Sequence, residues 1–188
     1  ALLGCGSWGK NIARNLSDMG YLSCVYDQNK NISEQFNKKY GLPNISIDEI
    51  LQNKEIDGVV IASSAITHKE LAAKSLLNDK DVLIEKPFCL SLSDAKHLSK
   101  LSTKRKRVLM AGHLLNYHNA FIKMKKIIND NVIGDVVNIR AHRLALGSIR
   151  SDESVTYDLA AHDISMVLSI TQSMTNEIQV QSIHHNNN

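Results

Sequence analysis

Residues 2–9 read LLGCGSWG, and this stretch decides the fold. Gly4, Gly6 and Gly9 match the pattern G-x-G-x-x-G, with apolar residues before it and a helical pattern after it. Asp27 closes a second apolar run, eighteen residues beyond Gly9. A strand, a glycine turn, a helix and an acid at this distance are typical of a loop that holds a dinucleotide. The first N–H groups of the helix would face the pyrophosphate.

Each glycine has a separate expected role. Gly4 would allow the tight turn, Gly6 would let the backbone approach the pyrophosphate, and Gly9 would let helix and strand pack closely. Glycine turns without a ligand share this pattern, and Asp27 also fits as a turn residue. The surrounding strand and helix favour the dinucleotide. A carboxylate at Asp27 would accept ribose hydroxyls and repel a 2′-phosphate, so we expect NAD rather than NADP.

Bulk composition excludes several classes of protein. The 188 residues are 43% hydrophobic and 22% charged, with a formal charge of +3, which is ordinary for a globular protein and gives no case for nucleic acid. No apolar run approaches the ~20 residues of a membrane span. Three widely spaced cysteines favour free thiols and a cytoplasmic location. The chain lacks an initial Met, its first strand is short and it stops after an expected strand, so we expect a fragment.

Strands and helices alternate down to about residue 112, which predicts right-handed βαβ units and a doubly wound parallel (Rossmann) sheet of the α/β class. The expected helices cover 7–19, 31–40, 46–53, 67–78 and the stretch that Ser91 caps, and the expected later strands cover 56–62, 81–84 and 107–111. We therefore place an NAD-binding domain at residues 1–115. The basic run 104–107 fits a helix C-terminus better than a localisation signal.

The pattern changes after that point. Residues 119–129 and 155–171 predict helices. Residues 136–146 predict a long strand with no helix directly after it, and residues 177–183 alternate as a half-exposed strand does. We interpret residues 116–188 as the start of an α+β domain with an open antiparallel sheet, truncated and serving substrate binding and oligomerisation.

Glu85, Lys86 and Pro87 follow the expected strand 81–84 directly. Ligands of a doubly wound sheet bind at the carboxyl ends of its strands, so Lys86 would project into the crevice. A lysine in a partly dry pocket can polarise or deprotonate a hydroxyl. A surface lysine in a turn explains the same residues about equally well.

Asp158 and His162 stand four residues apart on an expected helix and would share one face. An imidazole oriented by a carboxylate is a workable general base near pH 7. A capping acid and an unrelated helix-face histidine are the alternative. We expect no metal, because the scattered histidines and cysteines lack ligand spacing.

Taken in order, the glycine loop, the stretch 61–68 (IASSAITH), the Glu-Lys-Pro step and the pair Asp158 and His162 resemble the Gfo/Idh/MocA oxidoreductases. The resemblance covers almost the whole chain. It implies hydride transfer between a sugar carbon and NAD, with Lys86 and His162 as the catalytic pair and Asp158 as the supporting acid. The cofactor contacts it implies are Gly4, Gly6, Ser7, Trp8, Gly9, Asp27, Ser63, His68, Glu85 and Lys86.

The segments 143–150 (RLALGSIR) and 157–164 (YDLAAHDI) resemble the branch of this family that acts at the C3 hydroxyl of nucleotide-linked sugars. By that resemblance Tyr117 and Arg150 are candidate substrate contacts, and the complete protein is a homo-oligomer. Two alternatives stay open. One is a dehydrogenase of free sugars or inositol, and the other is a regulator that binds NAD or a sugar without chemistry.

Overall fold

The computed structural model describes residues 1–144 and 154–181. These residues form two units, which we describe separately. The sheet unit comprises residues 1–113 and 154–161, and the helical unit comprises 114–144 and 162–181. The expected boundary between residues 115 and 116 lies close to the end of the first stretch, but the return of 154–161 to the sheet unit has no signal in the sequence.

Five parallel strands make the sheet in the order β2-β1-β3-β4-β5. They are β1 (Leu2–Leu3), β2 (Val25–Tyr26), β3 (Gly58–Ile61), β4 (Asp81–Ile84) and β5 (Leu109–Ala111). The chain runs from β1 outward to β2 and then returns past β1 to β3. The order therefore reverses between β1 and β3, which is where such sheets bind ligands. The predicted α/β class with a parallel sheet is confirmed.

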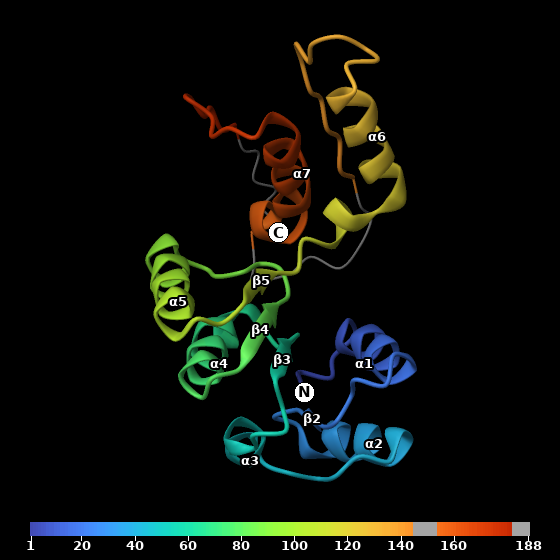
Figure 1. Cartoon of the computed structure of the whole chain (residues 1–188), viewed down its shortest axis with the longest axis vertical. Coiled ribbons are helices and arrows are strands. Elements are labelled where there is room, and N and C mark those ends of the chain that lie inside the picture. Colours follow the sequence, from blue (N-terminus) through green and yellow to red (C-terminus); the bar gives the residue numbers. More distant parts are fainter. Residues whose placement is uncertain (145–153, 182–188) are drawn as a thin grey trace, which may run out of the picture. The chain divides into compact units, whose positions relative to one another are not determined.

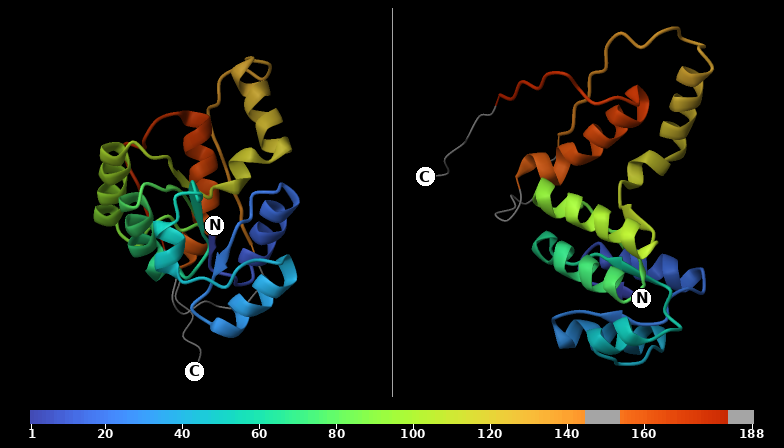
Figure 2. Two further views of the ribbon diagram at one scale, coloured as in Figure 1. Left: turned by 60° about the horizontal axis from the view of Figure 1, so that its bottom comes forward. Right: turned by 60° about the vertical axis from the view of Figure 1, so that its left-hand side comes forward.

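The helices of the sheet unit cover the two faces of the sheet (Figures 1 and 2). They are α1 (Gly9–Asp18), α2 (Lys30–Tyr40), α3 (Ile47–Gln52), α4 (Ala65–Leu77) and α5 (Leu92–Arg105). Leu2 and Val25 form one apolar cluster with α1 and α2. Leu3, Ile61 and Ile84 form the other with α3, α4 and α5. Successive residues of a strand point to opposite faces, so β1 contributes one side chain to each cluster.

Helix termini follow the expected capping chemistry. Ser46 and Glu49 form a reciprocal capping box at α3. The Ser91 side chain accepts the Asp94 N–H at α5, 3.1 Å away. Gly41 ends α2 with a φ of 66°, a left-handed conformation that glycine adopts without strain. These local signals explain why the predicted helix boundaries lie close to the observed ones.

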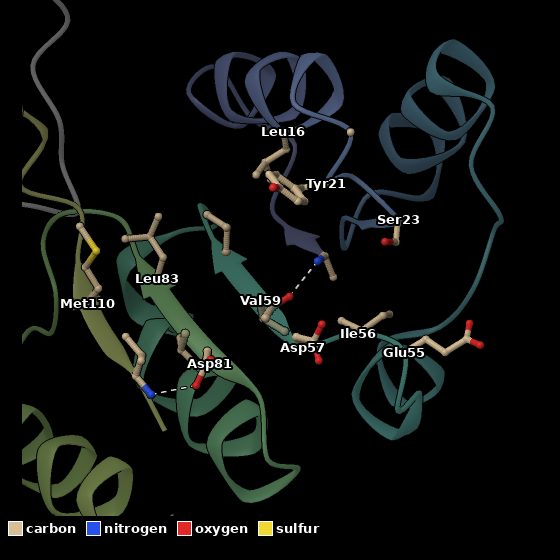
Figure 3. Close-up of a pocket in the computed structure, with 16 residues that line it drawn as sticks. Leu16, Tyr21, Ser23, Glu55, Ile56, Asp57, Val59, Asp81, Leu83 and Met110 are labelled. Atoms are coloured by element: carbon tan, nitrogen blue, oxygen red, sulfur yellow. Dashed lines mark hydrogen bonds between the residues drawn. The ribbon is translucent and has the colours of Figure 1, made fainter. Parts of the chain in front are cut away.

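One part of the sheet stays open. Val60, Leu83 and Met110 line a hollow of about 540 Å³ beside α1 (Figure 3). The apolar run 56–62 predicts a strand covered on both faces, but within the described sheet unit α1 and α2 pack over β1 and β2 and leave this side of β3–β5 partly exposed. An apolar run measures the hydrophobicity of a strand and does not say which segment covers it.

The helical unit pairs α6 (Asn119–Asn129) with α7 (Ala161–Thr171), after a 3₁₀ turn, Leu114–Tyr117. The Lys125 ammonium on α6 donates to the Ser169 hydroxyl on α7 at 2.7 Å. The described parts of the expected strands 136–146 and 177–183 are not strands. A strand needs a hydrogen-bonded neighbour, and the described part of this unit supplies none. The predicted antiparallel sheet is therefore not seen among these residues.

The described residues show neither a helix with the length and hydropathy to cross a membrane nor a cluster of three or more His, Cys, Asp or Glu side chains that could hold a metal ion.

Candidate active site

The glycine loop lies at the point where the strand order reverses. Gly4 has a φ of +99°, and a β-carbon there would collide with the backbone of Ala62 and Ser63 beyond β3. A β-carbon on Gly9 would collide with the Gly4 carbonyl oxygen. A β-carbon on Gly6 would meet nothing within 4 Å. Two glycines thus allow close packing, and Gly6 presents bare backbone to open space.

Asp27 connects the end of β2 to this loop. One of its carboxylate oxygens accepts the Cys5 N–H at 2.8 Å, and the other accepts the Asn29 N–H at 2.8 Å. The second bond is the turn that the alternative interpretation expects, so Asp27 both closes its own turn and fixes the glycine loop. Each oxygen still has a lone pair for a ribose hydroxyl.

A pocket of about 450 Å³ joins these features. Its walls come from the loops after β1, β2 and β3, from the first residue of α3 and from α4. Among the lining residues are Gly4, Gly6, Asp27, Ile47, Ser63, Thr67 and Leu71. The open backbone at Gly6 and the carboxylate at Asp27 both border this space. The residues present therefore fit a dinucleotide, with apolar side chains for its base and an acid for its ribose.

Glu85 links the glycine loop to the turn after β4. The Trp8 indole N–H donates to one oxygen of Glu85 at 2.8 Å, and the Lys86 backbone N–H donates to the other at 3.2 Å. Gly112 leaves room for this side chain, since a β-carbon there would lie 3.2 Å from the Glu85 carboxyl carbon. Burial lowers the pKa of the nearby His113, and the Glu85 charge opposes that shift.

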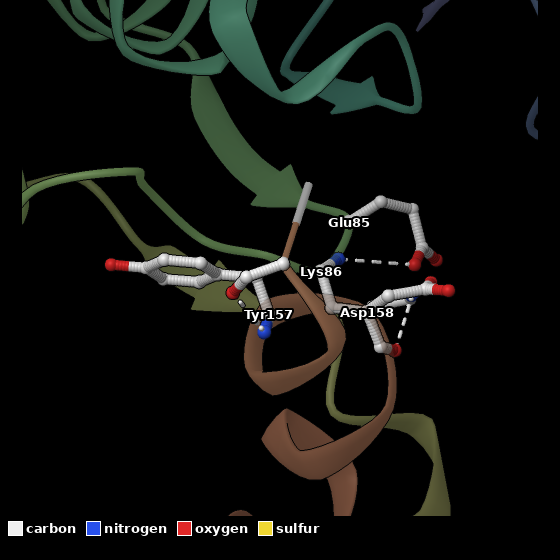
Figure 4. Close-up of polar contacts among 5 residues, drawn as sticks. Glu85, Lys86, Tyr157 and Asp158 are labelled. Atoms are coloured by element: carbon white, nitrogen blue, oxygen red, sulfur yellow. Dashed lines mark hydrogen bonds and ion pairs between the residues drawn. The ribbon is translucent and has the colours of Figure 1, made fainter. Parts of the chain in front are cut away.

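Lys86 is held by a segment far away in sequence (Figure 4). Its ammonium donates to the Asp158 carboxylate at 2.6 Å and to the Asp158 carbonyl oxygen at 2.8 Å. Both side chains are largely covered, with exposed fractions of 19% and 24%. Asp158 lies in a π-helical turn, Thr156–Ala160, directly before α7. Its expected role was to support His162; the contact with Lys86 is an arrangement that sequence reasoning missed.

Tyr157 makes a second connection between the same two segments. Its hydroxyl donates to the Leu90 carbonyl oxygen at 3.2 Å. The π-helical turn is thereby tied to the chain after β4 at two points, through Tyr157 and through Asp158. The sequence gives no separate signal for Tyr157, because its partner is a backbone carbonyl.

His68 is enclosed, although the family resemblance implies a cofactor contact. Its ring is 1% exposed, and its nitrogens face the Pro87 carbonyl oxygen at 2.8 Å and the Ser63 carbonyl oxygen at 3.1 Å. In this conformation any effect of His68 on the cofactor passes through the backbone it holds. Ser63 borders the nucleotide pocket, Trp8 is 45% exposed, and Ser7 lies exposed on the loop.

The helical unit carries the other expected residues. His162 is half-buried on α7, and its carbonyl oxygen accepts the Ser165 hydroxyl at 2.7 Å. Its neighbour Asp163 binds the Arg143 guanidinium through both oxygens, at 2.7 and 2.8 Å. This bidentate bond lowers the pKa of Asp163. Tyr117 is 63% exposed. Arg150 lies outside the described residues.

Comparison with known proteins agrees with this geometry. Residues 1–113 match the Gfo/Idh/MocA oxidoreductase family, NAD-binding Rossmann fold. The chain belongs to this family. A 2,7-anhydro-N-acetylneuraminate hydratase of Escherichia coli K12 is 31% identical over 145 residues, which are 76% of this chain and 38% of the relative. A myo-inositol 2-dehydrogenase of Thermotoga maritima is 26% identical over 94% of this chain and 56% of its own length.

Among solved structures, a UDP-N-acetylglucosamine 3-dehydrogenase from Acidithiobacillus ferrooxidans superposes with a TM-score of 0.84 at 26% identity, over 97% of this chain and 60% of that one. The chain spans 37–56% of the length of the curated relatives that it matches. The sheet unit is thus an NAD-binding Rossmann domain of an oxidoreductase family whose members named here act on sugars and inositols.

Proposed function

We propose that the protein containing this chain transfers hydride between a ring carbon of a sugar, presented as a nucleotide sugar, and NAD. The observation that carries the proposal is the Lys86 ammonium, paired with Asp158 at the same edge of the sheet as the nucleotide pocket. When bound, NAD supplies the hydride acceptor and donor. The protein supplies binding, orientation and the path of the proton.

The hydrogen bonds of Lys86 support this assignment. An ammonium has three N–H donors, and two of them go to the Asp158 carboxylate and carbonyl. Within the described residues the third N–H has no hydrogen-bond partner. Asp158 neutralises the charge and fixes the direction of the ammonium, so the third N–H is available to a substrate oxygen. We assign Lys86 to polarising that oxygen through this N–H.

His162 is the second member of the proposed pair. A neutral imidazole can take the hydroxyl proton as hydride leaves the same carbon, and it can return the proton in the reverse direction. The bidentate pair of Arg143 and Asp163 fixes the start of α7 beside His162. The family resemblance supports this role for His162.

The nucleotide-sugar assignment rests on two observations. The stretches 143–150 and 157–164 resemble the branch that acts on such sugars, and the structural neighbour with a TM-score of 0.84 is a UDP-N-acetylglucosamine 3-dehydrogenase. We assign Tyr117 and Arg150 to substrate contacts on the same basis. Inositol relatives favour a free polyol as the second candidate. Cytoplasmic location and homo-oligomerisation stay predictions.

The test uses the intact protein with NAD and four separate substrates: UDP-N-acetylglucosamine, its uronic acid, myo-inositol and glucose. NADH formation with the UDP-sugars alone supports the proposal. NADH formation with myo-inositol or glucose alone supports the free-sugar alternative. NAD binding without NADH formation in any mixture supports a regulator and contradicts the enzyme.

Lys86→Ala then tests the role of the ammonium. We expect turnover to fall by ~10² or more, because polarisation of the substrate oxygen is lost while the nucleotide pocket is intact. Calorimetry should give an unchanged affinity for NAD. Lys100→Ala, an exposed lysine on α5, is the matched control. Unchanged turnover in the Lys86 variant would remove this residue from the mechanism.

A further inference from the structure

His68 is the most enclosed polar side chain near the proposed site. It is the fourth residue of α4, and its ring is 1% exposed. The Nδ1 atom lies 2.8 Å from the Pro87 carbonyl oxygen, and the Nε2 atom lies 3.1 Å from the Ser63 carbonyl oxygen. Both partners are backbone oxygens, so the two ring nitrogens contact the protein itself and are not exposed to a ligand.

The two oxygens belong to turns with different roles. Ser63 follows β3, borders the nucleotide pocket and packs its backbone against Gly4. Pro87 follows β4 and is joined to Lys86 by the peptide bond on its amino side. The imidazole therefore spans the carboxyl ends of two neighbouring strands, from the wall of the pocket to the residue beside the proposed catalytic lysine.

The protons on the ring decide which connection is stronger. Carbonyl oxygens can only accept hydrogen bonds, and a neutral imidazole has one N–H to donate. The shorter distance, at Nδ1, favours donation to Pro87. The bond to Pro87 is thus the dominant one, because an imidazole with its one proton on Nδ1 has none on Nε2 to donate to Ser63.

We propose that His68 is a positioning residue for Lys86. Its ring holds the Pro87 carbonyl and thereby sets the direction in which the Lys86 side chain leaves the turn and reaches Asp158. This inference rests on the proposed function for its catalytic consequence. It differs from a direct contact between His68 and NAD, which the enclosed ring does not offer.

Two amide substitutions separate the two contacts. The side-chain nitrogen of asparagine is the same number of bonds from Cα as Nδ1 of histidine, and that of glutamine is the same number of bonds as Nε2. His68→Asn therefore keeps a donor for Pro87, and His68→Gln moves the donor toward Ser63. The amide group is the same in both variants. Ser75→Ala is the control for burial, because Ser75 is also on α4, is fully buried and donates only to the Leu71 carbonyl.

The kinetic test measures kcat and NAD affinity of the intact protein. We expect His68→Asn to keep kcat within about threefold of wild type and His68→Gln to lower it roughly tenfold or more, since small misplacements of a reacting group are costly. NAD affinity should change by less than about threefold in both, because neither substitution removes a wall of the pocket. General destabilisation would not produce a kcat that is kept by His68→Asn and lost in His68→Gln.

Equal values of kcat in the two variants, or weakened NAD binding with kcat intact, would overturn the proposal. If only His68→Asn folds, a kcat more than about tenfold below wild type contradicts it. Failure of both variants to fold while Ser75→Ala folds would make His68 a general stability element and would also overturn it.

Crystal structures of the variants test the inference without catalysis. The contact between Lys86 Nζ and Asp158 should persist in His68→Asn and be displaced in His68→Gln. An undisturbed contact in His68→Gln contradicts the positioning role. Absence of NADH formation in the wild-type protein would instead count against the proposed function, and the crystallographic comparison would still decide this inference.

Discussion

The sheet unit and the helical unit differ in where their apolar side chains lie. Among the described residues, every buried apolar side chain except Phe121 belongs to the sheet unit. In the helical unit Val137, Met174 and Val180 are 80–93% exposed. The local sequence is enough to make α6 and α7 helical. A buried core additionally requires other segments that pack over the apolar side chains of these helices. The comparison teaches that one chain can contain a unit with a buried apolar core and a unit whose described apolar side chains stay largely exposed.

The largest expected effect is on the free energy of unfolding, when one apolar side chain is truncated in each unit. Leu98→Ala removes a fully buried side chain of α5 from the larger cluster and should lower the free energy of unfolding by about 2–5 kcal/mol. Ile178→Ala truncates a side chain that is 75% exposed and should change it by about 0.5 kcal/mol or less. Urea denaturation of the 188-residue chain measures both. Similar losses would mean that the helical unit has a core of its own.

Substitution of one glycine with positive φ in each unit compares the cost of backbone strain in the two units. Gly4→Ala adds a collision with the Ser63 backbone to the strain of a φ of +99°, and should cost about 3 kcal/mol and abolish NAD binding. Gly134→Ala, at a φ of +75° with open space around it, should cost about 1 kcal/mol. Thermal unfolding and calorimetry measure these effects. A Gly4 variant that binds NAD normally would contradict the packing of this loop.

Helix capping should give a smaller effect. Ser91→Ala removes the side chain that accepts the Asp94 N–H, and should destabilise the sheet unit by about 1 kcal/mol. Ser64→Ala is the matched control, because Ser64 precedes α4 without a side-chain capping bond. Its unfolding midpoint should stay close to wild type. Equal shifts would show that the measured loss does not come from the capping bond.

The smallest effect concerns pH and the helical unit. Because Arg143 lowers the folded pKa of Asp163 below its unfolded value, the pair stabilises at neutral pH, and this contribution is lost as pH falls through the folded pKa. Unfolding of wild type and Asp163→Asn should therefore differ at neutral pH and converge in acid. Asp130→Asn, which breaks an exposed pair with Lys126, is the control and should show little difference. A gap that widens in acid would reverse the assigned sign.

Sequence patterns predict the local features of this chain and miss its long-range contacts. Ser46, Ser91 and Gly41 act on neighbouring residues, so the boundaries of α2, α3 and α5 follow from local chemistry. The glycine loop and Asp27 also lie where the motif predicts. The contacts of Lys86 with Asp158 and of Trp8 with Glu85 join residues 72 and 77 positions apart, and single-sequence periodicity contains no information on such pairs.

The strands expected in 136–146 and 177–183 illustrate the opposite case. Alternating apolar residues indicate that one face of a strand suits burial, but pairing requires a second strand with free N–H and C=O groups. The described part of the helical unit has none. Burial of His68 is similarly invisible in sequence, because its partners are carbonyl oxygens that every residue possesses.

A crystal structure of the intact protein with bound NAD tests the central claim most directly. The account predicts the pyrophosphate over the backbone at Gly6, the ribose at Asp27 and the nicotinamide beside the Lys86 ammonium. A nicotinamide ring directed away from Lys86, or a glycine loop that takes up no dinucleotide at saturating concentration, would contradict it.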